Sequence, residues 1–268
     1  MWEGDVWVAV RAARAGAEVV RHGFLDSFTT EMKGVVDPVT EVDRESEEAV
    51  KAVIATHFPD DAILAEEGGG ADWRGRRVWI VDPLDGTVNF VNRIPQVAVS
   101  VALWSEGKPL VGVVVDVSRD EEFVAAHGEG AHCNGEPIRV SDTSVLEDSL
   151  LVTGFPYDRQ EHARAYLDVM EQVMMRTRGT RRMGAAALDM AWVACGRFDG
   201  YWEHGGPAGV KPWDAAAGTL LVTEAGGMAT DSKGGVFDLE PSAFVVTNGK
   251  IHEDLRQIVD DYMPEHLR

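Results

Sequence analysis

Two aspartates stand three positions apart behind a run of apolar residues, in the stretch VWIVDPLDGTVNF that spans residues 78–90. Two carboxylates held close together repel each other, and burial at the end of a strand strengthens the repulsion unless a proton or a cation lies between them. Asp, Pro and Gly are also common turn residues, so a polar turn explains each of them taken singly. The spacing of Asp82 and Asp85 therefore supports two interpretations, a turn and a cation site.

Other acidic residues also fall at the ends of predicted helices and strands. A capping role, worth about 1 kcal/mol, would explain some of them, and exposure to solvent would explain others. Together they offer what Mg2+ requires, which is a near-octahedral set of oxygens from a few carboxylates, a backbone carbonyl, waters and substrate phosphate. Asp82 and Asp85 bracket such a carbonyl at Leu84. The acidic residues at predicted element ends are Asp43, Glu66, Asp82, Asp85, Glu203 and Asp214.

Composition limits the partners that the chain can have. The 268 residues, 45% of them hydrophobic, are enough to bury a full core, and the formal net charge of −20 would repel nucleic acid and anionic lipid. An anionic substrate would need a cation between itself and the protein. The two cysteines, Cys133 and Cys195, are too few for a disulfide framework, and no segment has the leader or membrane-span pattern. We expect a cytoplasmic protein without a nucleic-acid or membrane partner.

Hydrophobic periodicity predicts helices and strands for the first half of the chain. An apolar stripe at spacings of three and four indicates a helix over 7–24, and the capping-box pattern TEVD starts a second helix at Thr40, which ends near His57. AILAEEGGG is a short strand that delivers Glu66 at its end. Alternating apolar residues over 97–127 predict an antiparallel meander, and we interpret GEGAHCNG after it as a glycine-rich connection without nucleotide-binding spacing.

The second half predicts a mixture of helices and strands that would form a second lobe. Residues 1–145 and 146–268 are expected to be two lobes of one compact unit, because no linker or repeat separates them. The elements predicted after residue 145 are a strand at LLVTGF, a helix over 160–178 with Met-rich apolar positions, a buried helix in GAAALDMAWVACG, a strand that ends in Glu203, a helix from Asp214 to Gly227, a strand in SAFVVTNG and a final helix over 251–262.

Several motifs occur in an order that resembles the inositol monophosphatase family, a group of Mg2+-dependent and lithium-sensitive phosphatases. WIVDPLDGTVNF is similar to the family's D-P-[IL]-D-G-[ST] motif, and KPWDAAAGTLLVTEAGG resembles its W-D-x-x-[AG] signature. Lys33 ahead of DPVTEVD, the AEEGG segment and RRMGAAALDMAWVACGRFDGYWE match further motifs. The resemblance runs from about residue 31 to about residue 250. It implies an α/β (α+β) fold of the sugar-phosphatase type, a layered αβαβα sandwich with mixed, largely antiparallel sheets.

The resemblance also implies a role for individual positions. It implies two or three Mg2+ ions per active site, one held by Glu66, Asp82 and the Leu84 carbonyl and a second by Asp82, Asp85 and Asp214. It assigns orientation or deprotonation of the attacking water first to Glu66 and Thr87, with Asp43 and Thr40 nearby. The substrate-binding positions that it implies are Asp85, Gly86, Thr87, Gly184, Ala185, Ala186, Glu203 and Asp214, and a homodimer is implied as well.

The function implied is Mg2+-dependent hydrolysis of a small phosphate monoester, such as inositol monophosphate or a related polyol or sugar phosphate. Ala65, Ala185 and the interval of eleven positions from Glu203 to Asp214 depart from the usual family pattern and leave the substrate open. Histidinol-phosphate, fructose-1,6-bisphosphate or nucleotide 3'-phosphatase activity on the same scaffold are alternatives, for which Arg181 and Arg182 could bind a second anionic group. A regulatory module that binds metal without turnover is the alternative from another class.

Overall fold

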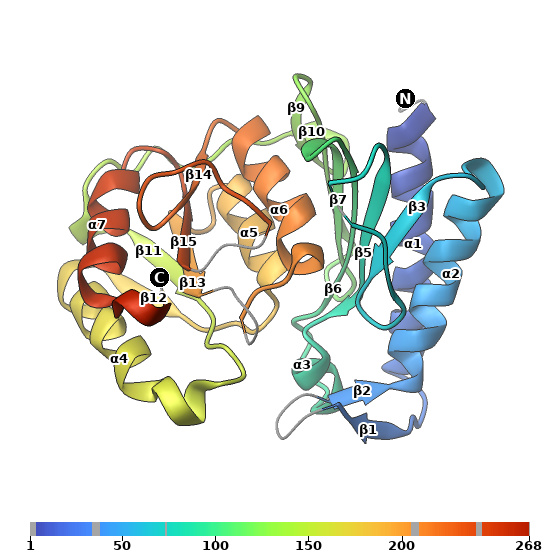
Figure 1. The fold of residues 1–268 in the computed structure, drawn as a ribbon, viewed down its shortest axis with the longest axis horizontal. Coiled ribbons are helices and arrows are strands. Elements are labelled where there is room, and N and C mark those ends of the chain that lie inside the picture. The colour runs from blue at the N-terminus through green and yellow to red at the C-terminus, as the bar shows by residue number, and fades with distance from the viewer. Residues whose placement is uncertain (1–3, 34–37, 73, 205–208, 240–242, 268) are drawn as a thin grey trace.

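Helices and sheets alternate through the molecule in the order αβαβα (Figure 1). The computed structural model describes residues 4–33, 38–72, 74–204, 209–239 and 243–267. Three apolar clusters lie between successive layers and hold them together. This arrangement confirms the predicted layered sandwich. None of the helices within the described ranges is long and apolar enough to cross a lipid bilayer.

The first layer consists of the helices α1 (Gly4–Gly23) and α2 (Glu41–His57), which pack against each other and on one face of the larger sheet (Figure 1). The predicted capping box is confirmed, because Asp43 Oδ2 accepts hydrogen bonds from Thr40 N at 2.8 Å and Thr40 Oγ1 at 2.5 Å. A Cβ at Gly16 would lie 2.7 Å from Ser46 Oγ, so glycine permits the close approach of the two helices. Two short strands, β1 (Thr30–Met32) and β2 (Pro38–Thr40), pair ahead of α2.

The larger sheet has eight strands among the described residues, in the order β10-β9-β8-β7-β6-β5-β3-β4. All of its neighbours are antiparallel except β3 and β5, and the predicted meander over 97–127 is confirmed. The prediction for GEGAHCNG is wrong, because four of its residues pair with β8 as a further strand. The bounds are β3 (Ala62–Ala65), β4 (Gly69–Gly70), β5 (Val78–Asp85), β6 (Ala98–Ser105), β7 (Lys108–Asp116), β8 (Glu121–Ala126), β9 (Gly130–Cys133) and β10 (Glu136–Pro137).

A bulge in β5 aims two carboxylates in one direction. Asp82 pairs with Ser100 and Asp85 pairs with Ala98, so three steps along β5 face two along β6. Side chains three positions apart in a regular strand point to opposite faces, and one extra residue cancels that difference. Pro83 lies within the bulge, where its missing N–H costs no ladder hydrogen bond. The two aspartates therefore belong to the strand itself and not to a turn after it.

The middle layer contains the helices α5 (Ala186–Ala194) and α6 (Pro212–Glu224), which lie between the two sheets (Figure 1). Small residues set how closely this layer packs. A Cβ at Gly112 of β7 would lie 2.8 Å from the Ala217 carbonyl oxygen, and a Cβ at Gly218 would lie 2.7 Å from Met190. The alanine-rich sequence of both helices thus brings their N-terminal ends close to β5.

The smaller sheet has the order β12-β11-β13-β15-β14 among the described residues, and α4 (Arg159–Arg176) and α7 (His252–Tyr262) cover its outer face. The strand with GYWE ends one residue later than predicted, at His204. The predicted helix over 160–178 is confirmed as α4, and two of its Met-rich apolar positions, Met174 and Met175, are 62% and 69% exposed. The remaining bounds are α3 (Thr87–Val91), β11 (Leu150–Thr153), β12 (Gly179–Arg181), β13 (Gly200–His204), β14 (Met228–Asp231), β15 (Ala243–Thr247) and the 3-10 turns Leu146–Asp148 and Glu265–Leu267.

Candidate active site

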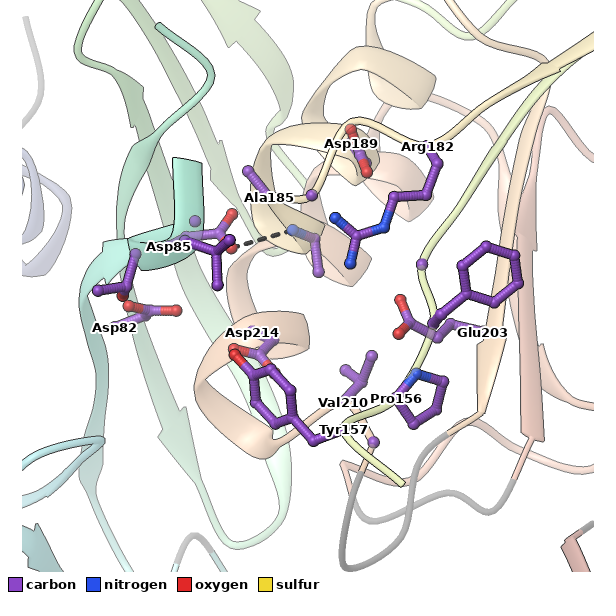
Figure 2. A pocket seen from close by; sticks show the side chains of 18 of the residues that line it. Asp82, Asp85, Pro156, Tyr157, Arg182, Ala185, Asp189, Glu203, Val210 and Asp214 are labelled. Carbon is purple, nitrogen blue, oxygen red and sulfur yellow. Dashed lines mark hydrogen bonds between the residues drawn. The ribbon is translucent and has the colours of Figure 1, made fainter. Parts of the chain in front are cut away.

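A cavity of about 320 Å³ opens between the larger sheet and the C-terminal half of the chain (Figure 2). It brings together residues that lie up to about 150 positions apart in the sequence. Every position predicted to bind metal or substrate lines this cavity. These residues are Glu66, Asp82, Leu84, Asp85, Gly86, Thr87, Gly184, Ala185, Ala186, Glu203 and Asp214.

Thr40 and Asp43, the other two predicted catalytic residues, lie behind the cavity wall. Thr87 Oγ1 lies 3.0 Å from Asp43 Oδ1 and 3.1 Å from the Leu84 carbonyl oxygen, and its single hydroxyl hydrogen can be donated to either. Asp43 is fully buried, and burial raises the pKa of its carboxyl group although Thr40 and Thr87 hydrogen-bond to it. Thr87 is therefore the member of this network that reaches the cavity.

Asp82 is 1% exposed, and three other carboxylates of the cavity lie near it. One of its oxygens, Oδ1, accepts the Leu84 N–H at 3.0 Å, which fixes the side chain against the bulge. Burial raises the pKa of Asp82 well above its ordinary value, and the nearby charges of Glu66, Asp85 and Asp214 raise it further. This is the electrostatic signature of carboxylates gathered without a compensating positive charge.

Asp85 joins the two halves of the molecule. Its Oδ1 accepts a hydrogen bond from the Ala186 N–H at 3.0 Å and its Oδ2 accepts one from the Leu188 N–H at 3.2 Å. The carboxylate at the end of β5 is therefore hydrogen-bonded to the first turn of α5 (Figure 2). Burial raises the pKa of Asp85 to about 8, with a further increase from Asp214, and these backbone hydrogen bonds act against it. A helix N-terminus stabilises negative charge, so this contact holds the carboxylate in place.

Asp214 enters the cavity from the first turn of α6. The helix begins with Lys211 as its N-cap and Pro212 as its first residue, and Asp214 Oδ2 accepts the Lys211 N–H at 2.7 Å. Asp214 is therefore the third helical residue, where a carboxylate reaches back in the second half of a capping box. The capping contact fixes the side chain next to Asp82 and Asp85.

Glu66 follows β3 and is paired with a cation of the chain itself. Lys33 Nζ donates a hydrogen bond to Glu66 Oε1 at 2.9 Å and another to Glu67. Burial raises the pKa of Glu66 to about 8, Lys33 lowers it, and Asp214 raises it. Burial disfavours the ammonium form of Lys33, but the two glutamates outweigh this effect and raise its pKa. Lys33 thus offsets part of the negative charge at this end of the cavity.

The oxygen donors of this wall fit a hard divalent cation. Within the described ranges, no three His, Cys, Asp or Glu side chains already stand in the arrangement of a ready-made metal site. The donors on this wall are nevertheless all oxygens, from the carboxylates of Glu66, Asp82, Asp85 and Asp214 and from the Leu84 carbonyl, which is the chemistry that Mg2+ prefers. The mutual repulsion that raises their pKa values is relieved when a cation binds, so the residues present fit Mg2+.

The opposite wall is built from the C-terminal half (Figure 2). Tyr201 Oη donates a hydrogen bond to Glu203 Oε2, and a Cβ at Gly154 would lie only 1.9 Å from the same oxygen, so only glycine fits beside this carboxylate. Burial raises the pKa of Glu203 to about 7, Tyr201 and Arg182 lower it, and Asp214 raises it. The Glu203 side chain is therefore fixed by Tyr201 and Gly154, on the side of the cavity opposite Asp82 (Figure 2).

Sequence motifs missed part of this wall. Gly154 and the three residues after it follow β11 and line the cavity, as do Arg159 and Asp189. No motif marks the segment after β11, and its one signal is a glycine near the end of the predicted strand LLVTGF. Asp189 lies in the motif RRMGAAALDMAWVACGRFDGYWE, but the segment around it was predicted to be a buried helix, which gave no indication that Asp189 lines a cavity. Residues 205–208, within the interval from Glu203 to Asp214, lie outside the described residues.

A layered αβαβα sandwich with an acidic cavity between its sheets is the architecture expected of a sugar-phosphatase type of protein. The model of the inositol monophosphatase family matches residues 3–263. Nus factor SuhB of Pseudomonas aeruginosa is 41% identical to this chain over 272 aligned positions, and the alignment covers 97% of each protein. The chain belongs to the inositol monophosphatase family.

Solved structures agree with this assignment. An inositol monophosphatase from Anabaena (Nostoc) sp. PCC 7120 superimposes with a TM-score of 0.86 at 39% identity and covers 98% of both chains. A structure described as an IMPase/NADP phosphatase complexed with Mg2+ and phosphate superimposes with a TM-score of 0.80 at 28% identity and covers 93% of both chains. The likeness therefore extends over nearly the whole chain.

Proposed function

We propose that the protein hydrolyses a small phosphate monoester, such as inositol monophosphate or a related polyol or sugar phosphate, with Mg2+ as cofactor. The observation that carries this proposal is the convergence of Glu66, Asp82, Asp85 and Asp214 on one cavity with the Leu84 carbonyl. Such a cavity repels a phosphate dianion unless cations lie between the two. The relative described with bound Mg2+ and phosphate supports this choice of cofactor.

Each metal-side residue has a distinct task in this proposal. Glu66, Asp82 and the Leu84 carbonyl would hold one Mg2+, and Asp82, Asp85 and Asp214 a second. When bound, Mg2+ supplies charge neutralisation of the phosphate and activation of a water molecule.

The chain's own residues then orient the reactants. Thr87 Oγ1, which contacts Asp43 Oδ1, would hold the attacking water and pass its proton toward that buried carboxyl group. The backbone N–H groups of Gly86 and Thr87 would face phosphate oxygens. On the other wall, Glu203 would accept hydrogen bonds from substrate hydroxyls without taking part in bond cleavage.

Phosphate release from a panel of monoesters tests the proposal. We expect EDTA to abolish release by the purified protein and Mg2+ to restore it, because carboxylates alone exclude the phosphate dianion. The panel includes inositol monophosphate, histidinol phosphate, fructose 1,6-bisphosphate and a nucleoside 3'-phosphate, so it also separates the alternatives on this scaffold. Undiminished release after exhaustive chelation would refute the proposal.

The second candidate is a regulatory protein that binds metal without turnover, and the observation in its favour is that the Pseudomonas relative is named a Nus factor. The intact set of four acidic ligands that lines one cavity argues for catalysis. Absence of Mg2+-dependent phosphate release across the panel, with Mg2+ binding retained, would favour the regulatory candidate. The homodimer that the family resemblance implies is a separate prediction, and light scattering tests it.

A further inference from the structure

Asp189 is a buried carboxyl group that the proposed reaction does not use. It lies in the first turns of α5, is 1% exposed, and lines the cavity. Its Oδ1 has no hydrogen-bond partner among the residues that the structure describes. An unsatisfied buried acceptor destabilises the folded protein, so a ligand that supplies the missing hydrogen bond to Asp189 Oδ1 gains part of that free energy on binding.

The surroundings of Asp189 belong to the wall opposite the metal ligands. Figure 2 shows Asp189, Arg182 and Glu203 on one side of the cavity and Asp82 and Asp85 on the other. Burial raises the pKa of the Asp189 carboxyl group, Asp85 and Glu203 raise it further, and Arg182 lowers it. Arg182 likewise lowers the pKa of Glu203, so the guanidinium group acts on both carboxyl groups.

Backbone geometry fixes this arrangement. Gly184 has a φ of 85°, and a Cβ there would lie 2.5 Å from Arg182 Nη1, so the guanidinium group lies close against the Gly184 backbone. The same turn leads into α5, whose first N–H groups hold Asp85. Asp189 and Arg182 are thus tied to the metal side through one short segment.

We propose that Asp189 is a specificity-determining residue, whose carboxyl group forms a hydrogen bond with a hydroxyl of the alcohol part of the phosphate monoester. The inference rests on the proposed function and names the substrate class more narrowly: an alcohol with further hydroxyls. A carboxyl group makes this contact in either protonation state, because it accepts a hydrogen bond when ionised and can also donate one when protonated.

Discrimination follows from the missing partner. A phosphate monoester whose alcohol part has no further hydroxyl leaves Asp189 Oδ1 buried and without a hydrogen bond. A polyol phosphate supplies that hydrogen bond. A site built to hydrogen-bond a substrate hydroxyl rejects analogues that lack it much more strongly than an apolar pocket rejects a change of size. Asp189 therefore penalises the wrong alcohol and leaves the phosphate chemistry unchanged.

The test compares two substrates that share a ring and a phosphate, myo-inositol 1-phosphate and cyclohexyl phosphate, in saturating Mg2+. The measured quantity is the ratio of their kcat/KM values. We expect Asp189→Leu to lower this ratio by about tenfold or more, mainly through KM for the inositol compound, since a hydrogen bond to a carboxyl group is lost. Asp189→Asn keeps a hydrogen-bonding group of the same shape, and we expect its ratio to stay within about threefold of the parent.

Two further variants control for misfolding and for the loss of one negative charge. Asp189→Ala is measured beside Asp189→Leu in case the larger side chain prevents folding, and Asp254→Asn on the exposed face of α7 is the matched control for loss of one aspartate. An unchanged ratio in the folded Leu or Ala variants would overturn the inference, as would equal losses on both substrates. Absence of phosphate release from either substrate by the parent protein would instead overturn the proposed function itself.

Discussion

The two walls of the cavity differ in how the chain builds them. The metal-side wall comes largely from one continuous stretch, Asp82–Thr87, at the bulge of a fully buried strand. The opposite wall is assembled from three separate segments, which supply Gly154, Asp189 and Glu203. In the proposed function the two walls have different roles, in which the strand carries the chemistry and the assembled wall selects the alcohol.

Asp82→Asn tests the metal-side wall and should have the largest effect. We expect kcat to fall by roughly 10³-fold, because the shared ligand of both proposed cations is lost. The metal-free variant should melt at the same temperature as the parent or higher, because a repelled buried charge is removed. Activity assays and thermal melting in EDTA measure the two effects, and near-normal turnover would mean that Asp82 is not a ligand.

Thr87 separates orientation of the water from metal binding. Thr87→Val should lower kcat by about 10²-fold, whereas Thr87→Ser, which keeps the hydroxyl, should stay close to the parent. Mg2+ affinity, measured by calorimetry, should change little in either variant because Thr87 is not among the proposed ligands. Equal losses in the two variants would assign Thr87 a packing role instead.

Glu203 tests the opposite wall with a smaller effect. Glu203→Gln should raise KM for a polyol phosphate by about tenfold, the scale of one charge-assisted hydrogen bond, and change kcat by less than about threefold. Steady-state kinetics on inositol monophosphate measure both constants. A loss confined to kcat would place Glu203 in the chemistry and erase the difference between the walls.

The smallest effect is a pH dependence of stability in the metal-free protein. Burial raises the pKa values of Glu66 and Asp85 to about 8, whereas an unfolded chain ionises such groups near pH 4. Between these values the folded state binds more protons than the unfolded state, so the free energy of unfolding falls as pH rises and levels off above about pH 8.

Thermal melting measures this pH effect directly. We expect Tm in EDTA to be several degrees lower at about pH 8.5 than at about pH 6, and the difference to shrink in saturating Mg2+. An increase in Tm over the same pH interval without metal would contradict the raised pKa values.

The sequence was most informative where the residues of the candidate site lie close together along the chain. The family resemblance implied the αβαβα layers, periodicity predicted most of their helices and strands, and the TEVD capping box predicted the Thr40–Asp43 contact correctly. The bulge in β5 was not predicted, because period-2 alternation does not reveal where one extra residue enters a strand. GEGAHCNG was predicted as a connection because its glycines disfavour a strand. Pairing with β8 nevertheless stabilises a four-residue strand there.

The assembled wall was harder to predict for a different reason. Glu203 was found because it lies in a recognised motif, but Gly154 and Asp189 take their places only when β11, α5 and β13 are packed together. Asp189 in a hydrophobic helix would ordinarily suggest a buried structural residue. Only its position at the cavity, with an oxygen that lacks a partner among the described residues, points to a ligand.

Calorimetric titration of Mg2+ into the parent protein, Asp82→Asn and Glu203→Gln tests the division between the walls most directly. The account predicts that Glu203→Gln binds Mg2+ as the parent does and that Asp82→Asn loses binding, because only the strand supplies the shared ligand. Parent-like Mg2+ binding by Asp82→Asn, or its loss in a folded Glu203→Gln, would contradict the account.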